Sequence, residues 1–322
     1  MPELPLVTIV TPSYNQSAYL EQTMRSVLEQ DYPNIEYLVV DGGSTDSSVE
    51  IIQRYADKLA WWVSEKDSGQ ADGINKGLRR ARGEVVAWLN SDDCYLPGAI
   101  RQAVEALQAN PQAGMVYADV YAIDETGKQT NRMRYQQWGL KDLLSFRILG
   151  QPGVFMRRSV LGQAGYLDQS YQYLLDHQLW VRIASLAPMV YVNTAWAEAR
   201  YHAAAKNISQ ASHFGEEAFR ILEWALSNPE TSKVMQQHQR TVWAGAQRFN
   251  ARYLLDAGME KDAWGGYVKA LRLDWREVLP EWHRMLYIPL SRIGFGKIKE
   301  IYLRWRTRQL QRRGTINKEN RT

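Results

Sequence analysis

Short apolar segments alternate with helical patterns through the first third of the chain. Five of these segments are predicted to be strands: LVTIVT (6–11), IEYLVV (35–40), AWWV (60–63), EVVAWL (84–89) and GMVYADVYAI (114–123). Between them, apolar residues recur every three or four positions, which predicts helices such as the one over 70–81. Strands and helices in this alternation favour an α/β fold, with a mostly parallel, Rossmann-like sheet sandwiched by helices.

Polar and turn residues follow four of the predicted strands. They are TPSYN (11–15), DGGS (41–44), EKDSG (65–69) and NSDD (90–93). The carboxyl ends of parallel strands meet at one edge of a sheet, and ligands of such folds bind beyond that edge. The sequence therefore predicts that these four segments lie together and form the binding site.

Four of the residues at these strand ends are carboxylates: Asp41, Asp67, Asp92 and Asp93. Carboxylates that are brought close together repel one another unless a cation is bound. Oxygen ligands suit Mg²⁺ or Mn²⁺, whereas one cysteine and five histidines argue against a closed zinc site. The alternative for each carboxylate is that it caps a turn or a helix.

Other features of the sequence exclude several classes of protein. There is no GxGxxG and no GxxxxGK[S/T] motif, so neither a dinucleotide site nor a P-loop is expected. Cys94 cannot form a disulfide within the chain, which fits a reducing compartment or simply a fold that uses no disulfides. The start MPELPLVTIV lacks the features of a secretory signal, and uncharged stretches such as 183–197 are too short for a membrane span. We therefore expect a cytoplasmic protein.

The blocks TPSYN, VVDGGSTD, EKDSGQADGINKG and AWLNSDD carry a family resemblance. In their order and spacing they resemble the family 2 glycosyltransferases of the GT-A fold, over residues 6–205. The resemblance implies a nucleoside-diphosphate sugar as donor, typically a UDP-sugar, and a divalent metal, Mn²⁺ or Mg²⁺. It also implies inversion at the anomeric carbon.

The resemblance assigns five residues to the nucleotide site. Thr11 and Tyr14 match positions that flank the nucleotide base, and Asp41 matches the carboxylate that accepts hydrogen bonds from the base. Asp67 and Asn75 match a segment near the ribose and the phosphates. These roles are expectations for this chain.

The triplet Asn90-Ser91-Asp92 matches the D-x-D motif of the family, with an amide in place of the first carboxylate. The match implies that Asn90 bonds the ribose as a neutral amide and that Asp92 is the carboxylate ligand of the metal. His202 matches a place where relatives have a histidine that joins the metal or the diphosphate; the alternative is a packed or surface histidine.

The segment 150–184 resembles the part of the family that positions the catalytic base at the start of a helix. Asp176 aligns with the family's Asp and is expected to be the general base; its alternative is a helix cap. Gln151 and Asp93 are expected on the acceptor side, although Asp93 can also cap the turn. One base suffices for a single inverting displacement, because a metal stabilises the leaving diphosphate without a proton donor.

Two other functions remain open from the sequence. A sugar-1-phosphate nucleotidyltransferase also needs a nucleotide and a metal, but TPSYN stands where its glycine-rich basic loop is expected. A non-catalytic scaffold that binds sugar nucleotides is the second alternative. Release of pyrophosphate would identify the nucleotidyltransferase. The absence of any release of nucleoside diphosphate would identify the scaffold.

The chain becomes almost purely helical after residue 212, which predicts a catalytic domain over 1–212 and a helical region over 213–322.

The net charge of +4 is concentrated between Lys297 and Arg313, where seven basic residues accompany one glutamate. Ile298, Ile301, Tyr302 and Trp305 share one helical face there. A basic amphipathic helix of this kind can lie on anionic lipid at the inner face of the membrane; a solvated or packed helix is the alternative. No nucleic-acid-binding module accompanies it, and the oligomeric state is undetermined.

Overall fold

The computed structural model describes residues 4–201 and 213–292, with side chains through residue 289. It divides into two compact units. The first contains the residues up to 122 together with 132–139 and 148–200, and the second contains 123–131, 140–147 and the residues from 201 onward. His202 and the basic segment 297–313 lie outside the described residues. The domain boundary expected at 212 adjoins undescribed residues and stays a prediction.

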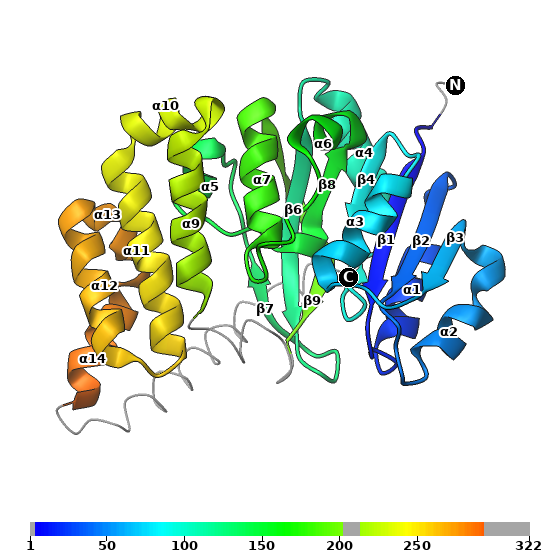
Figure 1. Cartoon of the computed structure of the whole chain (residues 1–322), viewed down its shortest axis with the longest axis horizontal. Coiled ribbons are helices and arrows are strands. Elements are labelled where there is room, and N and C mark those ends of the chain that lie inside the picture. Colours follow the sequence, from blue (N-terminus) through cyan, green and yellow to red (C-terminus); the bar gives the residue numbers. More distant parts are fainter. Residues whose placement is uncertain (1–3, 202–212, 293–322) are drawn as a thin grey trace, which may run out of the picture. The chain divides into compact units, whose positions relative to one another are not determined.

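Nine strands of the described residues form one mixed sheet (Figure 1) in the order β3-β2-β1-β4-β8-β6-β9-β5, and β7 pairs with β6 off this path. Their bounds are β1 (Val7–Ser13), β2 (Ile35–Asp41), β3 (Trp61–Ser64), β4 (Val85–Trp88), β5 (Cys94–Tyr95), β6 (Met115–Ile123), β7 (Gln129–Met133), β8 (Val154–Arg157) and β9 (Met189–Arg200). All five strands predicted from the apolar segments are therefore present.

The strands that lead to the predicted site are parallel. β1 runs parallel to β2 and to β4, and β2 runs parallel to β3. In this register Ser13 lies opposite Asp41, and Asp41 lies opposite Ser64. The segments that follow these four strands consequently leave the sheet at the same edge, as predicted. The sheet becomes antiparallel beyond β4, where β8 pairs with β4 and β6.

The helices of the first unit connect these strands. They are α1 (Leu20–Leu28), α2 (Ser48–Arg54), α3 (Gln70–Arg80), α4 (Ala99–Ala109), α6 (Arg158–Ala164) and α7 (Leu175–Leu186), with short 3₁₀ turns η1 (Ala56–Lys58) and η2 (Gln151–Gly153). α3 approaches β1 closely because Gly77 has no side chain: a Cβ atom there would lie 2.4 Å from Val10 Cγ1. This contact fixes α3 against the sheet and so fixes Gln70 at its first turn.

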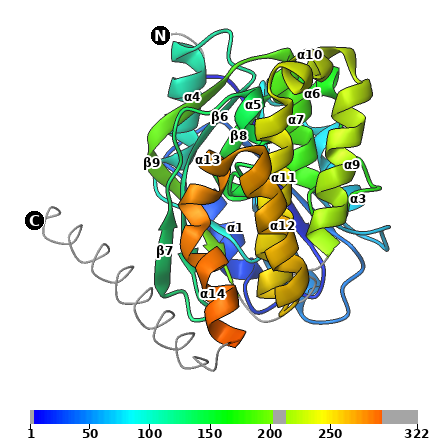
Figure 2. The same cartoon turned by 90° about the vertical axis from the view of Figure 1, so that its left-hand side faces the viewer.

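The second unit is helical apart from residues 123–131. Its helices are α5 (Leu140–Leu144), α9 (Phe214–Ser227), α10 (Pro229–Gln237), α11 (Gln239–Asp256), α12 (Glu260–Leu273), α13 (Trp275–Val278) and α14 (Trp282–Arg292), with η4 (Leu279–Glu281) between the last two. α11 and α12 lie side by side (Figure 2). Gly258 turns the chain between them: it has a φ of +80°, and the amides of Gly258 and Met259 donate to the carbonyls of Leu255 and Leu254. None of the described helices has the length and apolarity to cross a membrane.

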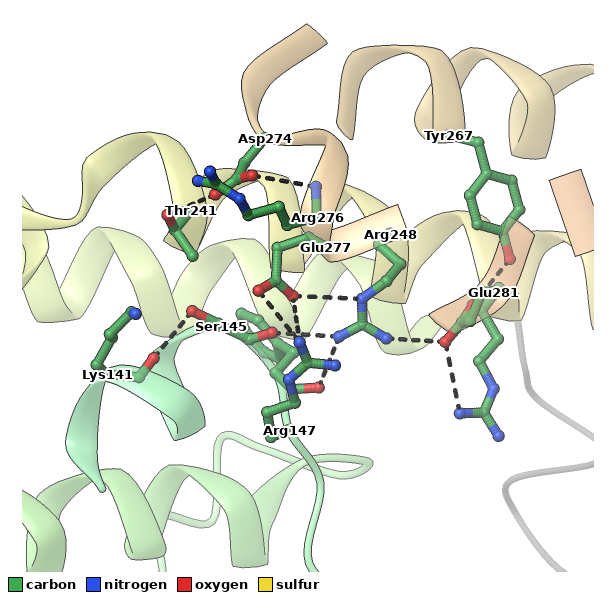
Figure 3. A network of polar contacts seen from close by, with 12 residues as sticks. Lys141, Ser145, Arg147, Thr241, Arg248, Tyr267, Asp274, Arg276, Glu277 and Glu281 are labelled. Atoms are coloured by element: carbon green, nitrogen blue, oxygen red, sulfur yellow. Dashed lines mark hydrogen bonds and ion pairs between the residues drawn. The ribbon is translucent and has the colours of Figure 1, made fainter. Parts of the chain in front are cut away.

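A buried polar network ties α5 to the later helices of this unit (Figure 3). Arg248 Nη1 lies 2.8 Å from Glu281 Oε1, and Arg248 Nη2 donates to the carbonyls of Ser145 and Phe146. Burial would raise the pKa of Glu281, but the nearby arginines, Arg248 first, outweigh burial and lower that pKa. Gly245 permits the close approach of α5, since a Cβ atom there would lie 2.2 Å from the Ser145 carbonyl oxygen.

Candidate active site

The loop after β1 is bound to the loop after β2 by hydrogen bonds. The Asn15 amide donates to Ser44 Oγ at 2.8 Å, and Asn15 Oδ1 accepts from the Thr45 amide at 2.8 Å. Asn15 has a φ of 51°, a left-handed conformation that asparagine tolerates better than most residues. This pairing holds the preceding residue, Tyr14, at the strand-end edge with 61% of its surface exposed.

Asp41 is the last residue of β2 and is fully buried. Its carboxylate accepts hydrogen bonds from the amides of Gly43 and Ser44 and from the hydroxyls of Ser44 and Ser64, at 2.5–3.1 Å. Both carboxylate oxygens are therefore used within the loop that we expect to meet the nucleotide base. A direct bond from Asp41 to a base would compete with these contacts.

Asp67 occupies space that two glycines leave open. A Cβ atom on Gly42 would lie 2.7 Å from Asp67 Oδ2, and one on Gly73 would lie 3.1 Å from the same oxygen. The other oxygen accepts a hydrogen bond from the Gly69 amide at 2.9 Å. The half-buried Asp67 carboxylate thus lies between the ends of β2 and β3 and the start of α3.

Two predicted donor-site residues lie below the strand-end edge. Thr11 is fully buried, and its hydroxyl lies 2.9 Å from the Tyr37 hydroxyl. Asn75 is 1% exposed, and its amide group makes both hydrogen bonds with the backbone of Leu167, at 2.8 and 2.9 Å. Asn75 therefore anchors the loop before α7, and a contact of either side chain with a nucleotide stays a prediction.

The Asn90–Asp93 turn begins beyond the end of β4. Asn90 Oδ1 accepts a hydrogen bond from Gln70 Nε2 at 3.0 Å, which connects the turn to the first residue of α3. Asn90 Nδ2 donates to Asp93 Oδ2 at 3.4 Å. Ser91 and Asp93 are buried, whereas Asp92 is half-buried at the surface of the turn. The two adjacent carboxylates thus have different environments.

Arg200 supports this turn and was not among the predicted site residues. The Arg200 amide donates to Asp93 Oδ1 at 2.9 Å, and its Nε donates to the Asp92 carbonyl at 3.1 Å. Its guanidinium group lies 4.6 Å from the centre of the Tyr19 ring. Burial, and then the charge of Asp92, raise the pKa of the Asp93 carboxyl well above its usual range. The sequence signal was weak because Arg200 is 107 residues from Asp93.

Gln151 joins β4 to the segment that is predicted to lie on the acceptor side. Its Nε2 donates to the Trp88 carbonyl at 2.8 Å. Its Oε1 is buried and has no hydrogen-bond partner among the described residues. An unpaired buried acceptor is costly, so this oxygen is suited to accept a hydrogen bond from a bound molecule.

Asp176 lies in the first turn of α7 and is half-buried. One of its oxygens accepts a hydrogen bond from the His177 amide at 2.7 Å. One turn later, Trp180 stacks on Trp88 with ring centroids 5.1 Å apart. Because Trp88 ends β4, this stack attaches the helix of Asp176 to the strand that leads into the Asn90–Asp93 turn.

The residues of the turn fit a hard divalent cation that is shared with a substrate. Within residues 4–201 and 213–289, no group of three or more His, Cys, Asp or Glu side chains is arranged to hold a metal ion by itself. Mg²⁺ and Mn²⁺ in nucleotide sites are commonly held by one or two carboxylates together with phosphate oxygens. Asp92 supplies such a carboxylate at the surface of the turn, and the Asp93 carboxyl beside it is buried.

Comparison with known families agrees with this geometry. The model of the family described as glycosyl transferase family 2 matches residues 8–165. A glycosyltransferase of Rickettsia typhi is 28% identical over 206 residues, which cover 62% of this chain and 64% of the relative. The chain thus spans less than two thirds of that relative's length.

Solved structures show the same fold at low sequence identity. The mannosyltransferase PcManGT from Pyrobaculum calidifontis, in complex with GDP-Man and Mn²⁺, has a TM-score of 0.62 and 20% identity, and the match covers 91% of this chain and 87% of that one. TarS 1–349 of S. aureus, in complex with UDP-GlcNAc, has a TM-score of 0.60 and 16% identity, with 87% and 91% covered. Both support the GT-A arrangement of the sheet and helices.

Proposed function

Because the chain belongs to the family 2 glycosyltransferases, we propose that it transfers one sugar from a nucleoside-diphosphate sugar to a hydroxyl group of a glycan or a lipid-linked acceptor. The observation that supports this proposal is the edge at which four parallel strands end. Tyr14, Asp67 and Asp92 all follow strands that end there. Such an edge is where open α/β sheets bind nucleotides.

The proposed donor is a UDP-sugar. Asp41 corresponds in the family to a carboxylate that typically bonds uracil, and Tyr14 is exposed beside it for contact with the base. TarS was solved with UDP-GlcNAc and PcManGT with GDP-Man, so both bases occur in proteins of this fold. We choose UDP because of the match at Asp41.

The proposed metal is Mn²⁺ or Mg²⁺, held by Asp92 and by His202, which lies outside the described residues. When bound, the cation supplies positive charge that stabilises the leaving diphosphate. Asn90 is proposed to bond the ribose, while its amide also maintains the turn through Gln70 and Asp93.

The proposed general base is Asp176. Its carboxylate accepts the proton of the acceptor hydroxyl while the hydroxyl oxygen attacks the anomeric carbon. The attack displaces the nucleoside diphosphate from the opposite face of the sugar, so the configuration inverts.

Gln151 Oε1 is a buried oxygen without a hydrogen-bond partner among the described residues, and it is proposed to orient the sugar acceptor by accepting a hydrogen bond from another of its hydroxyl groups. Asp93 is proposed to act on the acceptor side by supporting the turn, since Arg200 and Asn90 already bond its carboxyl group.

We further propose that residues 1–212 carry the catalysis and that 213–322 form a helical appendage of a cytoplasmic enzyme. The basic segment 297–313 is proposed to bring the enzyme to the inner face of the membrane, which suits a lipid-linked acceptor.

Two experiments test the proposed function. In a thermal-shift panel of UDP-, GDP- and dTDP-sugars, UDP-sugars with Mn²⁺ should raise the melting temperature most, because a ligand of the native state stabilises it. No shift with any nucleotide, with or without metal, contradicts the proposal. Pyrophosphate as the released product supports the nucleotidyltransferase alternative, and donor binding without any slow release of nucleoside diphosphate supports the scaffold.

The general base is tested by Asp176→Asn. Loss of a general base costs about 10²–10⁴-fold in rate, while the UDP-sugar thermal shift should remain near that of the wild type. Asp57→Asn, at an exposed aspartate of η1, is the matched control and should keep full turnover. Wild-type turnover in Asp176→Asn contradicts the assignment of the base.

A further inference from the structure

α13, η4 and α14 form one uninterrupted helical run in the second unit (Figure 2). The residues at the junctions keep helical backbone angles: Leu279 has φ −49° and ψ −43°, and Trp282 has φ −49° and ψ −35°. Side chains three or four positions apart therefore share a face of this run. The burial of the residues on each face of this run can therefore be compared.

One face of the run is buried in the helical unit. Val278 and Ile288 are 1% exposed and belong to the core cluster around Tyr267, against which Met285 also packs. Glu281 lies on this face and bonds Arg248 and the Tyr267 hydroxyl. The run is thus anchored through one side.

The adjoining, outward side of the run exposes four large apolar side chains. Trp275, Leu279, Trp282 and Leu286 are 53%, 52%, 57% and 49% exposed. Their spacing of four, three and four residues places them in a single row, which we call the Trp–Leu stripe. A surface helix ordinarily presents polar residues on its outer face, and a continuous apolar row there marks an interaction surface.

The charge around the Trp–Leu stripe is positive. Arg276 is exposed, and its guanidinium group lies 5.5 Å from the centre of the Trp275 ring; Lys269 and Arg272 are exposed on the preceding helix, α12. The glutamates of the run are turned inward, since Glu277 pairs with Arg147 and Glu281 pairs with Arg248. Asp274 is used as the cap of α13 and accepts hydrogen bonds from Arg276 and Thr241. An occupant of the stripe therefore meets apolar side chains and the Arg276 cation beside Trp275, with two further cations on the preceding helix.

We infer that the Trp–Leu stripe docks on the surface of an anionic lipid bilayer. Tryptophan favours the boundary between headgroups and acyl chains, and basic residues around an apolar row are attracted by anionic headgroups. The chain's own basic segment 297–313, or the same surface of a second copy, would bring like charges together at this site. This inference does not depend on the proposed transferase activity.

The experiment is co-sedimentation of the full chain with vesicles of phosphatidylcholine, alone or mixed with phosphatidylglycerol. The wild type should bind the anionic vesicles, and Leu279→Ser/Leu286→Ser should weaken that binding about tenfold or more, because each change removes apolar surface from the contact. Leu186→Ser/Leu226→Ser is the matched control, since these leucines are 42% and 41% exposed on other helices. It should bind like the wild type.

The basic segment 297–313 is present in all of these variants, so a difference between them reports on the stripe alone. Equal binding of the stripe variant and the wild type overturns the inference, as does wild-type binding that is no stronger for anionic than for neutral vesicles. A wild-type dimer in analytical ultracentrifugation that the stripe variant breaks, with vesicle binding unchanged, overturns it in favour of a second copy. Donor-dependent thermal shifts should be the same in every variant.

Discussion

At the scale of single residues, the position of the Asp67 carboxylate depends on two neighbouring glycines, which have no side chain. Gly42 and Gly73 leave the space that one Asp67 oxygen occupies, and the Gly69 amide holds the other oxygen. The position of the carboxylate is therefore set by the neighbouring backbone. Because Asp67 is a predicted donor-site residue, an added methyl group at either glycine should weaken donor binding more than it destabilises the fold.

Gly42→Ala tests this dependence. The new Cβ atom would lie 2.7 Å from Asp67 Oδ2, so the carboxylate must move. Since the end of a flexible side chain can shift easily, we expect a loss of about 1 kcal/mol or less in the free energy of unfolding. The Kd for a UDP-sugar should rise about tenfold, as judged by isothermal titration calorimetry.

The control for this prediction is Gly162→Ala, because a Cβ atom at Gly162 meets no atom within 4 Å. Donor affinity should be unchanged in that variant. Equal affinity of Gly42→Ala and the wild type would show that the Asp67 position does not matter for the donor.

At the scale of elements, Asp46 connects the loop after β1 to the start of α2. Its carboxylate accepts hydrogen bonds from the amides of Ser17 and Ser48, both at 3.0 Å. The side chain of Ser47, the N-cap residue of α2, makes no capping hydrogen bond. Asp46 caps α2 instead, because one of its oxygens accepts from the first amide of the helix while the other accepts from the loop after β1.

The stabilisation by Asp46 should depend on pH. Burial would raise the pKa of Asp46, but hydrogen bonds led by those of Ser48 and Ser17 outweigh burial and lower it to about 2. The unfolded value is about 3.9. A carboxyl group with a lowered native pKa stabilises the fold fully above its unfolded pKa and loses this effect as the pH falls through the native pKa.

Asp46→Asn should therefore melt below the wild type at pH 6, and the difference should shrink between about pH 4 and pH 2. Thermal melts at a series of pH values measure it. Asp57→Asn removes an exposed carboxylate of η1 and should show little difference at any of these values. A difference for Asp46→Asn that stays constant down to the lowest pH at which the protein folds contradicts the assigned pKa.

At the scale of the whole molecule, the parallel half of the sheet was predictable from the sequence. The apolar segments before Asp41 and Asn90 are short and bounded by turn residues, and helical spacing separates them. Local patterns of this kind specify strands and, through the α/β alternation, the edge at which they end. Confirmation came from the parallel registers of β1, β2, β3 and β4.

The contacts inside the candidate site could not be predicted in the same way. Asn75 is bonded to Leu167, 92 residues later, and Asp93 is bonded to Arg200, 107 residues later. Such pairs depend on tertiary packing and on the rotamer of each side chain, which leave no periodic signal in the sequence. The motif match indicated which residues gather at the edge, but only the structure shows that Asp41 and Asn75 are already hydrogen-bonded within the protein.

The division of the chain into two units could not be predicted from sequence patterns either. Residues 140–147 belong to the helical unit although residues on either side belong to the first unit. Arg248, which is 4% exposed, bonds both Glu281 and two carbonyls of that segment, and the Phe146 ring lies 5.1 Å from the Phe249 ring. Such long-range contacts hold this eight-residue segment in the second unit.

Arg248→Met should destabilise the protein strongly. It leaves Glu281 buried without its closest cation and removes the donors to the Ser145 and Phe146 carbonyls, and breaking a buried pair in this way costs about 3–5 kcal/mol. The melting temperature should fall by about 10 °C. Arg240→Met, at an exposed arginine that bonds only carbonyls of the α12 end among the described residues, should change it by about 2 °C or less.

Adding Glu281→Gln to Arg248→Met should recover part of the loss, because it removes the uncompensated buried charge while the new amide oxygen can still accept the Tyr267 hydroxyl. The stabilisation by a UDP-sugar should be equal in all these variants, since every predicted donor-site residue within the described part of the chain belongs to the first unit. A double variant less stable than Arg248→Met would mean that Glu281 stabilises the fold without Arg248. In that case the network depends on Tyr267 and Arg284 rather than on the Arg248–Glu281 pair.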